Sequence, residues 1–146
     1  MDFDLDVKLA VYRHFAATGV APSAAGIATG LGTTAAAVRE AFVRLRGRRV
    51  LLLEADGASI RMAPPFSGVP TQHRVEAGGI SYFANCAWDA LGIPAALHGP
   101  ATVFSRCEQS MEPLRIEVSA DWSGTSYWLF HCLVPAAKSW DDLVFT

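Results

Sequence analysis

The chain has 146 residues, of which 51% are apolar and 18% are charged, and its formal net charge is −2. This composition allows one packed domain or two very small ones, and it excludes an intrinsically disordered chain. No apolar run is long enough to span a membrane, and three cysteines, an odd number, indicate free thiols rather than a disulfide framework.

The first 66 residues predict three helices followed by a β-hairpin. The first helix covers residues 4–17 and ends at Gly19, the second is capped by Ser23, and the third is capped by Thr33 or Thr34. The inner face of the first helix is predicted to consist of Leu5, Leu9, Tyr12 and Ala16, and that of the third of Val38, Phe42 and Leu45. Residues 50–62 predict two short strands about an Asp-Gly turn. This order is typical of a winged helix-turn-helix, and we expect residues 1–66 to form that region.

Arginines cluster near the end of the third predicted helix, at Arg39, Arg44, Arg46, Arg48 and Arg49. In a DNA-binding winged helix they would contact phosphates, whereas in any helix cations favour the C-terminus and keep the surface solvated. Residues 1–66 carry eight Lys and Arg against six Asp and Glu, a net charge of only +2. We therefore favour the surface role and expect no nucleic-acid partner, while a regulator remains the alternative.

The second part, residues 67–146, carries four basic against eight acidic residues, a net charge of −4. Residues 63–73 contain three prolines and predict a linker, and residues 80–92 predict a helix that Gly92 and Pro94 stop. Strands are predicted over residues 73–79, 101–107, 114–120 and 127–134. The expected fold class is α+β, with the three-helix region followed by a small mixed or antiparallel sheet packed with a cysteine-bearing helix.

The helix predicted over residues 80–92 carries Cys86 and Asp89, which share one face because they are three residues apart. A carboxylate raises the pKa of a neighbouring thiol, so the pair suits a nucleophile beside a proton carrier. The alternative is a core cysteine beside a capping or surface aspartate. From its place near a helix N-terminus we expect Cys86 to favour the thiolate and to react first with thiol reagents. Trp88 and Trp122 are expected to fill the core or line a pocket.

Three stretches resemble the alkylmercury lyases: residues 82–97 ("YFANCAWDALGIPAAL"), 104–107 ("FSRC") and 133–146 ("LVPAAKSWDDLVFT"). The resemblance implies an enzyme that cleaves a carbon–mercury bond, with Cys86 as the mercury-binding nucleophile, Asp89 as the proton shuttle and Cys107 as a structural cysteine. In many members a second catalytic cysteine directly follows a stretch similar to residues 140–146, and here Thr146 is the last residue. We therefore expect either a truncated piece of a longer lyase-like protein or a protein that has lost the full reaction, and we expect residues 1–146 alone to turn over organomercurials very slowly or not at all. Cys132 does not match that position and is predicted to be a core cysteine.

The expected function is thus protonolysis of a carbon–mercury bond with Hg(II) bound by Cys86, and the alternative is a non-catalytic winged-helix regulator or ligand sensor on a lyase-like scaffold. Expected partners are an organomercurial or Hg(II) and small thiols, with a homodimer also considered. We expect no cofactor and no membrane partner. The acidic start of the chain, with Asp2, Asp4 and Asp6, does not fit a signal peptide, so the expected location is the cytoplasm.

Overall fold

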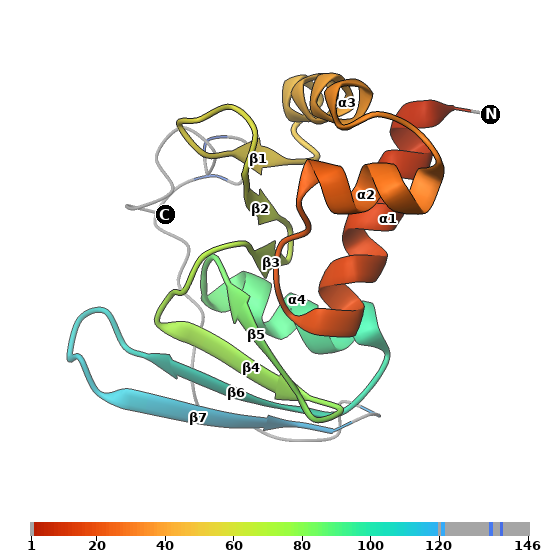
Figure 1. Ribbon diagram of the computed structural model, residues 1–146. Coiled ribbons are helices and arrows are strands. Elements are labelled where there is room, and N and C mark those ends of the chain that lie inside the picture. The colour runs from red at the N-terminus through yellow and green to blue at the C-terminus, as the bar shows by residue number, and fades with distance from the viewer. Residues whose placement is uncertain (1, 120, 122–134, 136–137, 139–146) are drawn as a thin grey trace.

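A computed structural model of the chain describes residues 2–119, 121, 135 and 138. Its helices are α1 (Phe3–Thr18), α2 (Ala24–Leu31), α3 (Ala35–Gly47) and α4 (Ala87–Leu97). Its strands are β1 (Leu52–Leu53), β2 (Ile60–Ala63), β3 (Phe66–Ser67), β4 (His73–Ala77), β5 (Ile80–Ala84), β6 (Ala101–Arg106) and β7 (Pro113–Val118). The first three helices lie together at one end of the molecule, and β4 to β7 form a broad sheet at the other (Figure 1).

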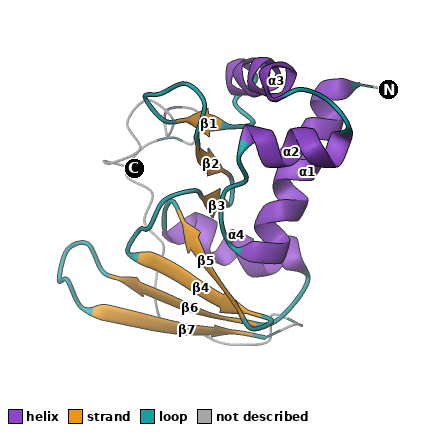
Figure 2. Ribbon diagram, in the orientation of Figure 1, coloured by secondary structure: helices purple, strands orange, loops and turns teal. Residues whose placement is uncertain are grey.

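The strands form one antiparallel sheet in the order β1-β2-β3-β5-β4-β6-β7. Helix α4 packs against β4, β5 and β6 (Figure 2). The α+β class, with a three-helix region and a sheet packed with a cysteine-bearing helix, is therefore confirmed. The expected division at residues 66 and 67 falls inside β3, and the division into two domains and the winged-helix assignment stay predictions. None of the described helices has both the length and the apolar character needed to cross a membrane.

The predicted caps of the first three helices are confirmed. Ser23 and Thr34 each accept a hydrogen bond from a backbone N–H in the first turn of the helix that follows. Gly19 ends α1 with a φ of 76°, and a Cβ at that position would lie 2.1 Å from the backbone oxygen of Ser81. Only glycine fits there, since both the left-handed conformation and the close approach of β5 exclude a side chain.

The predicted inner face of α1 is wrong at Leu5 and Leu9, whereas Tyr12 is partly buried and packs against the core. The buried residues of α1 are Asp4, Val7, Val11 and Phe15, whereas Leu5 is 48% exposed and Leu9 is 39% exposed. Asp4 joins this face because Arg44 of α3 donates hydrogen bonds to its carboxylate at 2.7 and 3.0 Å. The hydrogen bonds from Arg44 hold the pKa of Asp4 below its usual value. Two arginines of the predicted cluster, Arg44 and Arg48, therefore form ion pairs with Asp4 of α1.

The stretch predicted as a linker, residues 63–73, is instead part of the sheet through β3. Phe66 pairs with Ala84 of β5, and its ring stacks on Phe15 of α1 with centroids 5.3 Å apart. Pro65 packs against α4, because a Cβ on Gly92 would lie 3.1 Å from the Cβ of Pro65. This stretch therefore packs between α1 and α4.

The helix predicted over residues 80–92 is wrong in its first half. Residues 80–84 form β5, which pairs with β4 through a two-residue turn of Gly78 and Gly79, both with positive φ. The helix α4 begins only at Ala87 and continues through Gly92 and Pro94, which were expected to stop it. The strands predicted over 73–79, 101–107 and 114–120 are confirmed as β4, β6 and β7, and the strand predicted over 127–134 lies outside the described residues.

Candidate functional site

Cys86 is the N-cap of α4, not a residue in the middle of a helix. Strand β5 ends at Ala84, and the extended backbone of Cys86 turns the chain from the sheet into the helix. Its Sγ accepts a hydrogen bond from the backbone N–H of Asp89 at 3.5 Å. The spacing is that of a capping box, in which the N-cap side chain accepts from the third helical residue. A thiol in place of the usual hydroxyl puts a soft nucleophile at this position.

Asp89 lies in the first turn of α4, within reach of the Cys86 thiol. Burial raises the pKa of Asp89 from its usual 3.8 to about 6, and a hydrogen bond with Cys86 partly offsets that rise. A carboxyl group with this pKa interconverts between its acid and carboxylate forms near neutral pH. The pair can therefore hold one proton on either member and exchange it.

The expectation that Cys86 favours the thiolate is wrong. Burial is the largest influence and raises the pKa of Cys86, and the charge of Asp89 raises it further, while the backbone N–H groups of Trp88 and Asp89 lower it. The helix N-terminus is thus outweighed by burial and by a neighbouring carboxylate. Near neutral pH the favoured form of the pair is a thiol beside a carboxylate.

The surroundings of Asp89 include Tyr12 of α1, which the sequence predicted only as an apolar face residue. Burial raises the pKa of the Tyr12 phenol, and the charge of Asp89 raises it further. The Tyr12 ring makes an edge contact with the ring of Phe66 at 6.5 Å. No sequence signal pairs Tyr12 with Asp89, because 77 residues separate them and only the packing of α1 on β3 brings them together.

Cys107 follows β6 and begins the turn that leads to β7. Hydrogen bonds from the Ser110 hydroxyl and from the backbone N–H groups of Ser110 and Gln109 lower the pKa of this thiol. His73 of β4 pairs with Ala84 of β5, and on the other side its Nδ1 lies 2.8 Å from the Ser105 hydroxyl of β6. Cys86 lies two residues after Ala84, and Cys107 lies two residues after Ser105. Because β4 separates the two strands, the strands themselves lie about two strand spacings, or roughly 10 Å, apart.

Other predicted residues contribute little to this site. Trp88 is 64% exposed and so does not fill the core. Trp122 and Cys132 lie outside the described residues, as does the stretch 139–146. In the part of the chain that the structure describes, no three His, Cys, Asp or Glu side chains are arranged to hold a metal ion.

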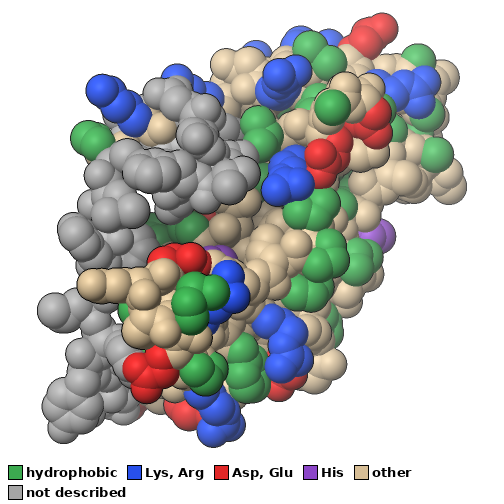
Figure 3. All heavy atoms as spheres, turned by 90° about the vertical axis from the view of Figure 1, so that its left-hand side faces the viewer, with side chains coloured by type: hydrophobic (Ala, Val, Ile, Leu, Met, Phe, Trp, Pro, Cys, Tyr) green, Lys and Arg blue, Asp and Glu red, His purple; other side chains and the backbone are tan. Residues whose placement is uncertain are grey.

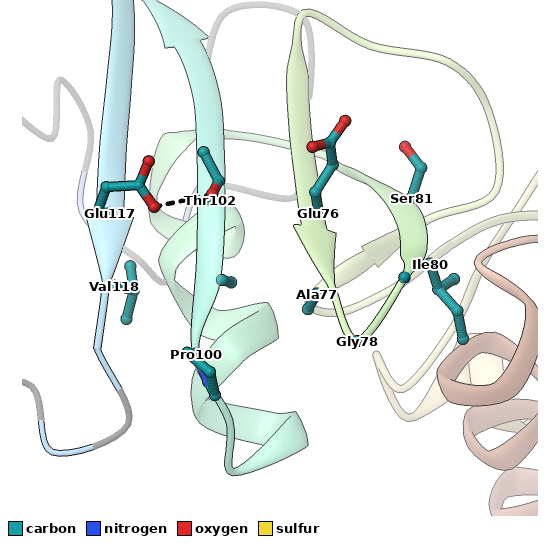
Figure 4. Close-up of a pocket in the computed structure, with 11 residues that line it drawn as sticks. Glu76, Ala77, Gly78, Ile80, Ser81, Pro100, Thr102, Glu117 and Val118 are labelled. Carbon is teal, nitrogen blue, oxygen red and sulfur yellow. Dashed lines mark hydrogen bonds between the residues drawn. The ribbon is translucent and has the colours of Figure 1, made fainter.

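A cleft of about 450 Å³ lies beside the Gly78–Gly79 turn of the β4–β5 hairpin (Figure 4). Cys86 follows the other end of β5, which ends at Ala84. Glu76, Ser81, Thr102 and Glu117 line it, and the Thr102 hydroxyl donates a hydrogen bond to Glu117 at 2.8 Å. This cleft contains no thiol, and its carboxylates also pair with Arg74 and Arg115. It is therefore separate from the thiol–carboxyl pair.

On the face shown in Figure 3, acidic and basic side chains are interspersed among the described residues.

The family model that matches this chain covers the half that contains the thiol–carboxyl pair, and a solved structure matches more of the chain. A family model for MerB, alkylmercury lyase, matches residues 66–145, which is more than half of the chain. A crystal structure of the mercury-bound form of MerB2 is similar, with 25% sequence identity and a TM-score of 0.63. That match covers 79% of this chain and 56% of the other, so this chain spans little more than half of that protein. A search of curated proteins found no match.

Proposed function

The chain belongs to the alkylmercury lyase family, and we propose that it cleaves carbon–mercury bonds by protonolysis at Cys86 and Asp89. The observation that carries the proposal is the contact between the Cys86 Sγ and the first turn of α4, beside a carboxyl group whose pKa is about 6. Mercury is a soft metal that prefers thiolate ligands, and protonolysis needs an acid beside the metal-bound carbon. The similar MerB2 structure has mercury bound, which supports Hg(II) or an organomercurial as the ligand here.

In the first step, the Cys86 thiol gives its proton to the Asp89 carboxylate while its sulfur bonds to the mercury of an organomercurial R–Hg–X. The raised pKa of Cys86 disfavours a free thiolate, so the nearby carboxylate serves as the base at the moment when mercury takes up the sulfur. Sulfur donates electron density to mercury and weakens the bond from mercury to carbon.

In the second step, the protonated Asp89 donates that proton to the carbon. The electron pair of the carbon–mercury bond becomes the carbon–hydrogen bond, and Asp89 returns to the carboxylate. The balanced reaction is Cys86–SH + R–Hg–X → Cys86–S–Hg–X + R–H. A pKa of about 6 suits both halves of this cycle, because Asp89 must accept a proton from sulfur and then release it to carbon.

Cys107 has a structural part in this proposal. Its thiol takes hydrogen bonds from its own turn, and its backbone N–H donates to the carbonyl of Glu112 at 2.9 Å. These bonds fix the turn between β6 and β7.

A second candidate is binding of Hg(II) without turnover, as in a ligand sensor. The observation that favours it is that, within the described residues, Cys86 is the single thiol beside Asp89. The alkylmercury lyases use two catalytic cysteines. In this case the protein would retain mercury on Cys86 but release no hydrocarbon.

Incubation with phenylmercury and measurement of benzene separates the two candidates. The lyase proposal predicts benzene from the wild-type protein and from Cys107→Ser, and little or none from Asp89→Asn. Mercury bound to Cys86 without benzene from any variant would support the sensor and contradict the lyase proposal.

A further inference from the structure

Tyr12 lies on α1, an element that the mechanism above does not use. On α4, Gly92 lies three residues after Asp89 and therefore on the same side of the helix. Gly92 packs on Pro65, since a Cβ at Gly92 would lie 3.1 Å from the Cβ of Pro65. The side of α4 that carries Asp89 is thus turned toward the segment that begins β3.

Three aromatic rings surround Phe66, the next residue of that segment. The ring centroids of Phe15, Tyr82 and Tyr12 lie 5.3, 5.7 and 6.5 Å from that of Phe66. Phe15 and Tyr82 are almost fully buried, and the Tyr82 hydroxyl donates to the carbonyl of Ala16 at 2.7 Å. Tyr12 is only partly buried. Of these three rings, Tyr12 is therefore the one with a surface that a ligand can contact.

The packing of the chain brings that surface toward the side of α4 that carries Asp89, because this side packs on Pro65 and the Tyr12 ring contacts Phe66, the next residue. In agreement with this packing, the Asp89 carboxylate raises the pKa of the Tyr12 phenol. Lys8, one turn earlier on α1, lies 6.0 Å from the centroid of the Tyr12 ring. The wall that α1 contributes to the site is thus aromatic, with a cation at its edge.

We propose that Tyr12 is a specificity-determining residue, whose ring forms the wall of the thiol–carboxyl site against which the organic group of the ligand lies. This inference rests on the proposed function, because the proposed transfer of a proton from Asp89 determines which way the organic group points. The carbon that receives a proton must approach Asp89, so the organic group attached to that carbon occupies the space between Asp89 and Tyr12. Aromatic rings prefer edge or offset contacts with one another, so this wall favours aryl over small alkyl groups, by roughly three- to tenfold.

The test compares two thiol reagents that differ only in this group, N-phenylmaleimide and N-ethylmaleimide, with the rate at Cys86 followed by peptide mass spectrometry. Each rate is divided by that of the same reagent with glutathione. In Tyr12→Leu and Tyr12→Met the phenyl-to-ethyl ratio should fall roughly three- to tenfold, because each keeps apolar bulk but removes the ring. Tyr12→Phe should keep the wild-type ratio. Leu9→Ala, on the exposed side of the same helix, is the matched control and should also keep it.

A second measurement uses phenylmercury and methylmercury in competition and determines benzene and methane. The same variants should shift the product ratio toward methane. An unchanged maleimide ratio in whichever of Tyr12→Leu and Tyr12→Met folds, judged by circular dichroism, would overturn the role of Tyr12 even if hydrocarbon is released. A changed maleimide ratio without hydrocarbon from any variant would uphold the role of Tyr12 and overturn the lyase proposal.

Discussion

Cys86 begins α4 and Cys107 begins the turn between β6 and β7, and their surroundings shift the two thiol pKa values in opposite directions. Burial, the largest influence, raises the pKa of Cys86, with a further rise from Asp89. Hydrogen bonds from Ser110 and Gln109 lower the pKa of Cys107, for which burial is a minor influence. Both residues are partly exposed, so exposure alone does not distinguish them.

The difference shows that the more acidic thiol need not be the functional one. A low pKa speeds reaction with small electrophiles, because the thiolate is the nucleophile. Cleavage of a carbon–mercury bond also needs a proton near the metal-bound carbon, and the Asp89 carboxyl group beside Cys86 has a pKa of about 6, so it can take up and release a proton near neutral pH. At Cys107 the main influences are hydrogen bonds that Ser110 and Gln109 donate to sulfur, and the charge of Glu112 has the smallest influence.

The largest expected effect comes from removing the proton carrier. Asp89→Asn keeps the shape of the side chain but cannot carry a proton, so the rate of benzene release from phenylmercury should fall by about 10²- to 10⁴-fold. Gas chromatography of the headspace measures it. Ser110→Ala, which alters the surroundings of the other thiol, is the matched control and should keep a rate near that of the wild type. A similar rate in Asp89→Asn would show that the proton comes from elsewhere.

The same substitution should change stability in a pH-dependent way. The pKa of Asp89 is about 6 in the folded chain against a usual 3.8, so folding favours the protonated form. The contribution of Asp89 to stability is therefore fully present below pH of about 4 and is lost as the pH rises through about 6. At pH 8, Asp89→Asn should be more stable than the wild type by about 1–3 kcal/mol, and this difference should shrink below pH of about 4. Urea unfolding across this range measures it, and a difference that does not vary with pH would contradict the raised pKa.

Alkylation rates test the two thiols directly. At pH 7, iodoacetamide should react with Cys107 about ten times faster than with Cys86, because Cys107 has the larger thiolate fraction. Peptide mapping by mass spectrometry measures both rates in one sample. The helix N-terminus alone predicts the opposite order of rates, with Cys86 the faster thiol. Faster alkylation of Cys86 would therefore contradict the raised pKa of Cys86.

A smaller effect is expected from Ser110→Ala on Cys107. The substitution removes the hydroxyl that hydrogen-bonds to sulfur but keeps the backbone N–H groups of Ser110 and Gln109, so the alkylation rate of Cys107 at pH 7 should fall only about two- to fivefold. The rate at Cys86 should not change. Equal slowing of both thiols would indicate a general change in the fold.

The sequence predicts the order of elements well where local signals are strong. The Asp-Gly turn between β1 and β2, the caps Ser23 and Thr34 and the helix end at Gly19 all lie where the residue types indicate. The spacing of Cys86 and Asp89 also brings them together, although at a helix N-terminus rather than along a helix. The two glycines Gly78 and Gly79 are a hairpin signal, which predicts a strand directly after them. This signal would have shown that residues 80–84 form a strand and that the helix begins later.

The remaining errors have tertiary causes. Two stripes of α1 fit a helical period equally well, and Asp4 makes the correct one look polar because its partner Arg44 lies 40 residues away. The helix α4 continues through Gly92, on which Pro65 packs, and through Pro94, which is buried, and this packing outweighs the low helix propensity of both residues. The place of Tyr12 beside Asp89 depends in the same way on contacts between distant parts of the chain.

The most direct test of the central claim is the release of benzene from one equivalent of phenylmercury by Cys86→Ser and by Cys107→Ser. Serine is a better N-cap than cysteine, so Cys86→Ser should keep α4 and remove only the sulfur that binds mercury. The account predicts no benzene above background from Cys86→Ser and release close to that of the wild type from Cys107→Ser. Release by Cys86→Ser together with its loss in Cys107→Ser would contradict the account and assign the chemistry to the other thiol.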